Sequence, residues 1–166
     1  MAYTIRNYRN DDAEALRDLT IQAIKSIGSK AYSAEQVEAW SAGHRDVDCI
    51  RRRVAAGVWI FVAANHADHP VAFALLEPPF EGSAHLDMLY CHPDHTRHGL
   101  ADQLLARAEN FGHANGAKRL YSEASELARP AFERAGYTMT HRRDFAITHE
   151  GREVPIHNYA MEKLLG

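Results

Sequence analysis

The sequence lacks several features that would assign it at once to a class of protein. Only two cysteines, Cys49 and Cys91, occur among 166 residues, and no CxxC pair is present. A disulfide framework is therefore excluded, and reduced thiols in a cytoplasmic protein are the simplest interpretation. No apolar run approaches the roughly 20 residues of a membrane span, and the N-terminus turns polar too early for a signal peptide. We expect a cytoplasmic protein with no membrane partner.

An excess of charge of one sign is also missing. The chain has 19 basic and 22 acidic residues, which gives a net charge of −3. Such a balance supplies no basic field for nucleic acid, so we expect no nucleic-acid partner. No internal repeat, low-complexity tract or linker divides the chain, and its length suits one core. We therefore expect a single domain over residues 1–166.

Patterns of period two and of helical spacing indicate an α/β protein. A Ser33-x-x-Gln36 capping box predicts one helix start, and Gly28 is interpreted as the end of the preceding helix. The sequence HEGR predicts the turn of a long final hairpin. Strands are predicted over 3–9, 58–65, 70–78, 84–91, 117–125, 137–148 and 152–165, and helices over 10–27, 33–43, 47–57, 99–114 and 128–136.

The stretch CHPDHTRHGLADQLLARAE, residues 91–109, has three competing interpretations. A metal site would use His92, His95 and His98, but Pro93 opposes a helix there and no standard zinc spacing is completed. A strand-to-helix loop with solvated histidines is the simplest alternative. A phosphate cradle is the third, because the free N–H groups and the dipole of a helix start attract an anion.

The cradle interpretation explains the residues around the helix start. Gly99 allows close approach of a diphosphate, Ala101 keeps the helix start narrow, and Arg97 adds positive charge. Neither the G-x-G-x-x-G fingerprint nor the G-x-x-x-x-G-K-[ST] pattern of a P-loop is present. The cradle therefore belongs to neither of those two nucleotide-binding classes.

Residues LYCHPDHTRHGLADQLL resemble motif A of the GNAT acetyltransferase superfamily, a strand and a proline followed by Q/R-x-x-G-x-G/A. Gly99 and Ala101 match this pattern, whereas Thr96 replaces the usual Gln or Arg. A later family pattern, N-x-x-A-x-x-x-Y-x-x-x-G-F/Y, resembles SELARPAFERAGY. In that segment Ala128, Gly136 and Tyr137 fit, and Ser125 and Phe132 depart.

The resemblance implies a fold, a donor and a reaction. The fold is a single-domain α/β GNAT fold, with a mixed, mostly antiparallel sheet splayed between its central parallel strands and helices on both faces. Acetyl-CoA donates the acetyl group to an amine by direct attack, without a metal. The donor-binding residues implied are Leu89, Tyr90, Cys91, Arg97, His98, Gly99, Leu100, Ala101, Asp102, Ser125 and Phe132.

Proton transfer needs a base, and three residues near the expected splay point are candidates. His85 and Asp87 share a strand face by the period-two rule, and Glu123 lies on the neighbouring strand. Phe132 has no hydroxyl with which to protonate the departing thiolate, so Tyr137 or helix dipoles are the remaining candidates. Cys91 is interpreted as a small hydrophobic residue rather than a nucleophile.

The acceptor is not specified by any motif. Aromatic and histidine residues of the expected acceptor side suit an apolar amine, although core packing explains them equally well: Tyr32, Trp40, His44, Trp59 and Phe80. The leading hypothesis is N-acetylation of a small-molecule primary amine. A protein or peptide N-acetyltransferase and a non-catalytic acyl-CoA-binding regulator are the alternatives, and a homodimer is left open.

Overall fold

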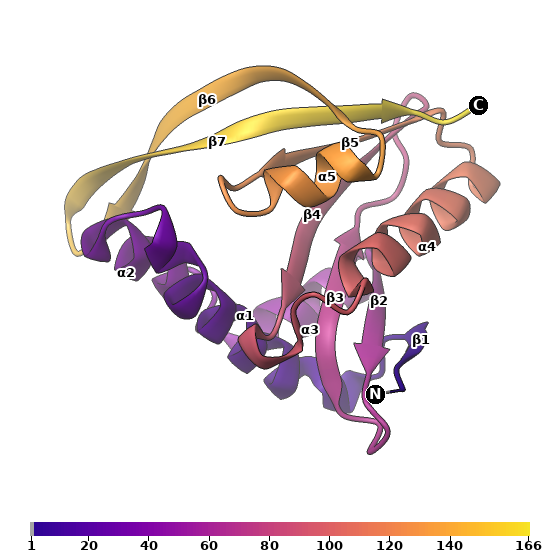
Figure 1. Ribbon diagram of the computed structural model, residues 1–166, viewed down its shortest axis with the longest axis horizontal. Coiled ribbons are helices and arrows are strands. Elements are labelled where there is room, and N and C mark those ends of the chain that lie inside the picture. The colour runs from indigo at the N-terminus through magenta and orange to yellow at the C-terminus, as the bar shows by residue number, and fades with distance from the viewer. Residues whose placement is uncertain (1) are drawn as a thin grey trace.

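One seven-stranded sheet, in the order β1-β2-β3-β4-β5-β7-β6, organises the chain (Figure 1). The structure is a computed structural model that describes residues 2–166. Every neighbouring pair of strands is antiparallel except β4 and β5, which are parallel. The strands are β1 Thr4–Asn7, β2 Trp59–Ala64, β3 Pro70–Leu76, β4 Ser83–Cys91, β5 Arg119–Ala124, β6 Thr138–His149 and β7 Arg152–Leu164.

Helices cover both faces of the sheet, because its central strands are apolar on both sides. On β3, Phe73 and Leu75 pack toward α1 and α3, whereas Ala72, Ala74 and Leu76 pack toward α4. The mixed α/β fold with helices on both faces is thus confirmed. The helices are α1 Ala13–Ser26, α2 Ala34–Ala42, α3 Val47–Ala55, α4 Leu100–Ala114 and α5 Arg129–Arg134, with 3₁₀ turns at Asn10–Asp12, Gly28–Lys30 and Pro93–His95.

The parallel strands β4 and β5 separate soon after they meet. Their pairing runs only from Ser83–Arg119 to His85–Tyr121. Just beyond it, the buried Ser122 hydroxyl donates a hydrogen bond of 2.6 Å to the carbonyl oxygen of Leu86. From there β4 continues beside β3 and β5 continues beside β7. The predicted splay therefore begins at Leu86, where a side-chain bond stands at the end of the backbone ladder.

The last two strands form a long hairpin that extends over α2 (Figure 1). Its two turn residues, Glu150 and Gly151, have φ values of 52° and 75°, as a type I′ turn requires. The hairpin predicted from HEGR is confirmed. Within residues 2–166, every helix is too short or too polar to cross a membrane.

The local signals were mostly correct, but Gly28 was misinterpreted. The Ser33–Gln36 capping box forms, with both of its hydrogen bonds at 2.8 and 3.1 Å. Gly28, by contrast, starts a 3₁₀ turn rather than capping α1 with a left-handed residue. A Cβ atom there would lie 3.2 Å from the ring of Trp40. This glycine is therefore explained by close packing against Trp40.

Candidate active site

A cavity of about 200 Å³, here called the donor cavity, lies where β4 and β5 have separated. Its walls come from the end of β4, the start of α4, and α1 together with the segment before α5. Five of the residues predicted to bind the donor line it: Leu89, Tyr90, Cys91, Ala101 and Ser125. Most of the lining is apolar, which suits a long, uncharged chain better than a charged group.

The start of α4 has the geometry expected of an anion cradle. Gly99 is the N-cap residue with φ of 72°, and Arg97 also has a positive φ of 65°. The first bond of the helix runs from the Gln103 N–H to the Gly99 carbonyl, at 3.1 Å. The N–H groups of residues 100–102 therefore precede the helical ladder. A Cβ atom on Gly99 would meet no atom within 4 Å, so the space beside the glycine is open.

The other residues predicted for the cradle have different surroundings. The side chains of Arg97 and His98 are exposed, and that of Leu100 is buried in the core. Asp102 lies 3.7 Å from Arg134 at the surface. An anion at the start of α4 can therefore bind the backbone N–H groups of Leu100 and Asp102 but not their side chains. The exposed side chain of Arg97 can approach the same anion.

The three histidines of this stretch each have a structural contact, and His95 and His98 share Tyr3. His92 caps the 3₁₀ turn by accepting a hydrogen bond from the Asp94 N–H at 3.1 Å. His95 is hydrogen-bonded to the hydroxyl of Tyr3 at 2.9 Å, and the ring of His98 packs on that tyrosine ring. They do not converge on one point, and the metal interpretation gains no support here.

A second cavity, here called the acceptor cavity, has a volume of about 230 Å³ and lies beneath the β6–β7 hairpin. It shares Trp40, Tyr90 and Ser125 with the donor cavity, so the two spaces meet beyond the splay point. Its remaining walls come from β4, β5, the hairpin and the region of α2: Tyr32, His44, Asp87, Met88, Glu123, Phe145, Ile147, Ile156, His157 and Asn158.

His85 links two carboxylates beside this cavity. Its Nδ1 lies 2.9 Å from Glu77 and its Nε2 lies 2.7 Å from Glu123, with the ring stacked on Tyr121 at 4.8 Å. Burial lowers the pKa of His85, but the hydrogen bonds to Glu123 and Glu77 outweigh burial and raise it to about 9. The ring is thus an imidazolium at neutral pH. It has no free nitrogen, so His85 is unsuited to the role of base that its ordinary pKa had suggested.

Asp87 and Glu123 both line the acceptor cavity, but only Asp87 is paired with an arginine. Arg53 donates to Asp87 at 2.5 Å and to Glu77 at 3.2 Å. Within residues 2–166, Glu77, His85 and Asp87 form the one group close enough to hold a metal ion. Arg53 and the His85 imidazolium already supply positive charge there, so this group does not need a metal to balance its carboxylates.

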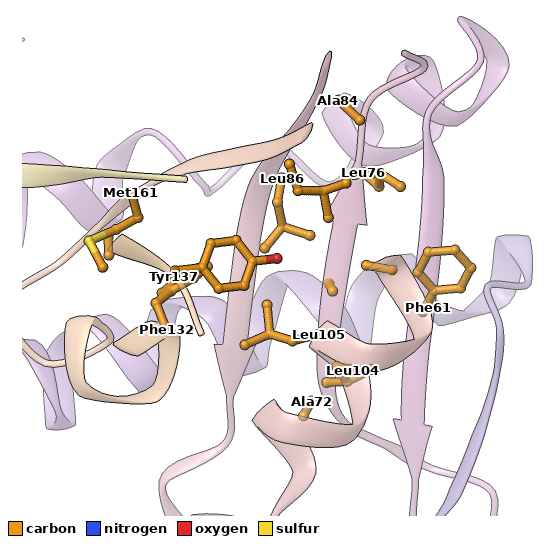
Figure 2. Close-up of a cluster of buried hydrophobic side chains, with 14 of the residues drawn as sticks. Phe61, Ala72, Leu76, Ala84, Leu86, Leu104, Leu105, Phe132, Tyr137 and Met161 are labelled. Carbon is orange, nitrogen blue, oxygen red and sulfur yellow. The ribbon is translucent and has the colours of Figure 1, made fainter. Parts of the chain in front are cut away.

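Tyr137 and Phe132 lie in the core (Figure 2). Neither residue lines the donor cavity or the acceptor cavity. Their rings pack edge to face at 5.1 Å, and each side chain is less than 5% exposed. The Tyr137 hydroxyl donates to Glu109 on α4 at 3.1 Å. Burial and the neighbouring Glu109 raise the pKa of Tyr137 above its ordinary value. These contacts engage the hydroxyl with α4 and place it outside both cavities, so of the two candidates for stabilising the thiolate the geometry does not favour Tyr137.

Cys91 lies in the wall of the donor cavity with its Sγ 3.4 Å from the carbonyl oxygen of His95. Burial raises the pKa of this thiol to about 11. At neutral pH it is therefore protonated, and a thiol is a poor nucleophile. This geometry agrees with an apolar role on the strand.

Sequence reasoning missed His157 and gave His44 only a place in the acceptor region. His157 comes from β7 and is held by Glu126 at 2.6 Å. The ring of His44 packs against Tyr90 at 5.7 Å, and burial lowers its pKa, an effect that Asp87 opposes. No spacing rule links residues so distant along the chain. The long hairpin was the one available signal for His157, because alternate residues of its strands must face the body of the protein.

A splayed parallel strand pair, a helix that begins after a left-handed glycine and two joined cavities are the features that the resemblance to GNAT acyltransferases implied. Residues 29–152 match the family described as "Acetyltransferase (GNAT) domain". The chain is 32% identical over 134 residues to the uncharacterized N-acetyltransferase YafP of Escherichia coli strain K12, covering 80% of this chain and 79% of YafP. The chain therefore belongs to the GNAT acetyltransferase family.

Solved structures agree with this assignment. The GCN5-related N-acetyltransferase from Rhodopseudomonas palustris superimposes with a TM-score of 0.85 and 30% identity, covering 99% of this chain and 97% of the other. The PaiA N-acetyltransferase from Thermoplasma acidophilum, solved with coenzyme A, has a TM-score of 0.75 and 19% identity over 99% of each chain. At 19% identity, the similarity to the Thermoplasma protein supports the fold alone.

Proposed function

We propose that this enzyme transfers the acetyl group of acetyl-CoA to the primary amine of a small molecule by direct attack. The observation that carries the proposal is the junction of the donor and acceptor cavities at Tyr90 and Ser125. A thioester entering along β4 and an amine entering beneath the hairpin would meet at this junction. The coenzyme A bound to the Thermoplasma relative supports the same donor.

The residues present suit each part of the donor. The N–H groups at the start of α4, with Arg97 beside them, offer hydrogen bonds and positive charge to the pyrophosphate. The apolar donor cavity suits the pantetheine chain, and the backbone of residues 89–91 borders the gap left by the splay. Main-chain groups on such an exposed strand edge can pair with amides of a ligand.

Glu123 is the proposed acceptor of the ammonium proton. Its carboxylate lines the acceptor cavity, and His85 holds one of its oxygens at 2.7 Å. The free amine nitrogen then attacks the thioester carbonyl carbon, forming the C–N bond. The C–S bond breaks, and its electron pair leaves with sulfur as a thiolate. The second proton of the attacking nitrogen then passes to that thiolate or to water, which leaves a neutral amide. His85 acts as a positioning residue in this step.

The departing thiolate needs no dedicated acid. Phe132 has no hydroxyl, and the Tyr137 hydroxyl is bound to Glu109. A thiol pKa of about 8.5 makes thiolate a tolerable leaving group near neutral pH.

A small acceptor is favoured by the walls of the acceptor cavity. The hairpin and α2 both contribute to these walls, and the hairpin contacts α2 directly. An extended peptide needs a groove that is open at both ends, which fits less well beneath this cover. The peptide alternative therefore ranks second.

The test is acetyl-CoA turnover, read as release of free thiol, with a panel of primary amines and of peptides with free N-termini. We expect amine-dependent thiol release with small amines and confirmation of the N-acetyl product by mass spectrometry. Preference for peptides would establish the alternative acceptor. Tight acetyl-CoA binding, measured by calorimetry, with no turnover of any amine would indicate a non-catalytic sensor.

A further inference from the structure

The acceptor cavity combines carboxylates with aromatic rings. Asp87 and Glu123 are its two acidic lining residues, and no lysine or arginine is found among the lining residues within 2–166. The ring-bearing lining residues are Tyr32, Trp40, Tyr90, Phe145, His44 and His157. The faces of aromatic rings attract cations, and their apolar bodies bury hydrocarbon.

The charges behind the cavity wall do not cancel. Glu77, Asp87 and Glu123 supply three negative charges, and they are connected by Arg53 and His85, which supply two positive charges. His85 carries its charge because each ring nitrogen faces a carboxylate, at 2.9 and 2.7 Å. One negative charge remains, and the two carboxylates at the cavity wall are where a bound cation can balance it.

The hairpin contributes two cations near this cavity, Arg142 and Arg143, and neither is among its lining residues. Arg143 donates to Asn158 at 2.9 Å, and its guanidinium lies 5.1 Å from the centre of the Phe145 ring. Glu126 is hydrogen-bonded to the ring of His157 and to the hydroxyl of Tyr159, and both of these residues lie on β7. Arg142 pairs with Asp144 and Arg143 donates to Asn158, while Glu126 is itself an anion, so none of the three supplies a counterion to Asp87 and Glu123.

The cavity is large enough for a ring with a short chain. An apolar cavity of about 150 Å³ can hold benzene, and this one has about 230 Å³. An ammonium group beside Glu123 would leave the rest of such a molecule among the rings of Trp40 and Tyr90. A carboxylate or phosphate on the same molecule would lie near Asp87 and Glu123, where like charges repel.

We propose that the acceptor is a monoamine with an aromatic or branched aliphatic body and no acidic group, rather than an amino acid. This inference rests on the proposed function, because it specifies the acceptor for the same reaction. The amine enters as its ammonium ion, and Asp87 with Glu123 select it by charge. The rings then select it by apolar contact.

The test uses three acceptors with the same phenyl ring and amino group that differ in the substituent on the α-carbon: 2-phenylethylamine with none, phenylalanine amide with a neutral amide, and phenylalanine with a carboxylate. We expect kcat/KM for the amine and the amide to be similar, and that for the amino acid to be at least about a hundredfold lower, which corresponds to about 2.7 kcal/mol. The amide separates the effect of charge from that of branching at the α-carbon. Assays at about pH 8 keep ordinary histidines neutral.

A matched pair of variants tests the cause of this selectivity. Ile147→Lys adds a cation to the cavity wall, whereas Ala146→Lys adds it on the exposed opposite face of β6. Only Ile147→Lys should reduce the ratio of kcat/KM for 2-phenylethylamine to kcat/KM for phenylalanine, and we expect a reduction of about tenfold or more.

Two results would overturn the inference while leaving N-acetylation established. One is equal or faster turnover of phenylalanine, and the other is turnover of phenylalanine that is lost in Arg143→Ala. The second would identify Arg143 as a binding group for an acidic substituent. Turnover of other small amines but of none of these three would also overturn the inference alone, whereas absence of turnover with every amine and peptide of the panel, despite bound acetyl-CoA, would overturn the proposed function itself.

Discussion

At the scale of single residues, the site shows how a partner changes the role of a side chain. The ordinary pKa of a histidine suits a general base. In His85, however, hydrogen bonds to Glu123 and Glu77 raise the pKa and keep the ring protonated. Glu123, one of those carboxylates, is the group that faces the acceptor cavity. Sequence reasoning could name both residues, since they lie on neighbouring strands. It could not separate the proposed base, Glu123, from His85 as its proposed positioning residue, because the contact between Glu77 and His85 was not foreseen.

Glu123→Gln tests this assignment of the base. The amide keeps the shape but cannot accept the ammonium proton, so we expect kcat to fall between about a hundredfold and ten-thousandfold. The KM for acetyl-CoA should change little, because Glu123 does not line the donor cavity. His85→Gln should lower kcat less and alter its pH profile. A larger loss in His44→Gln than in Glu123→Gln would assign the base to His44.

Tyr137→Phe tests whether the core tyrosine has a catalytic role. Its hydroxyl donates to Glu109, which also accepts from Lys163 at 2.7 Å, so Glu109 keeps a partner in the variant. We expect unchanged turnover and a loss of about 1 kcal/mol in the free energy of unfolding. Urea denaturation and steady-state kinetics on the same preparation measure both. A thousandfold loss of kcat with intact acetyl-CoA binding would make Tyr137 the acid.

At the scale of elements, local rules predicted what depends on a few neighbouring residues. The Ser33–Gln36 capping box and the Glu150–Gly151 turn form as expected because each is completed within four residues. The start of the splay at Leu86 and the hairpin residues facing the cavity could not be located, since they depend on strands far apart in the chain. Gly28 was misassigned for the same reason, because Trp40 determines its role.

Gly99→Ala tests the cradle at the start of α4, and Gly116→Ala at the other end of the helix is its control. Both glycines have positive φ, 72° and 97°, and a Cβ atom on either would meet no atom within 4 Å. Each variant should therefore lose a similar stability, about 1–2 kcal/mol. Only Gly99→Ala should weaken acetyl-CoA binding, by about tenfold or more, because its methyl group fills the space beside the N–H groups.

Isothermal calorimetry with acetyl-CoA and thermal denaturation of both variants measure these two effects separately. Equal affinity in the two variants would contradict the cradle and leave the glycine a purely structural role. Arg97→Ala provides a further comparison, because a lost charge should weaken binding more at low salt than at high salt.

At the scale of the whole molecule, charged side-chain networks add to the backbone hydrogen bonds that join neighbouring elements. The His85 network joins Glu77 after β3, His85 on β4 and Glu123 on β5, close to the point where the sheet splays. At the far edge, Arg6 on β1 binds the buried Asp12 with two hydrogen bonds of 2.8 and 2.9 Å. Burial opposes ionisation of Asp12, but Arg6 prevails and lowers its pKa. Asp12 therefore stabilises the fold above its unfolded pKa, and that stability is lost as pH falls through its lower folded pKa.

The His85 network predicts the opposite dependence at alkaline pH. The folded pKa of His85 is raised from 6.5 to about 9, so the folded state binds the proton more tightly than the unfolded state. Its stabilisation is complete below about pH 6.5 and is lost as pH rises through about 9. The shift corresponds to about 3 kcal/mol of unfolding free energy. Urea denaturation of the wild type and of His85→Gln at about pH 6 and pH 10 measures this difference. We expect the stability gap between them to shrink by up to that amount, whereas a constant gap would show that His85 is neutral in the folded protein and that Glu123 lacks its charged partner.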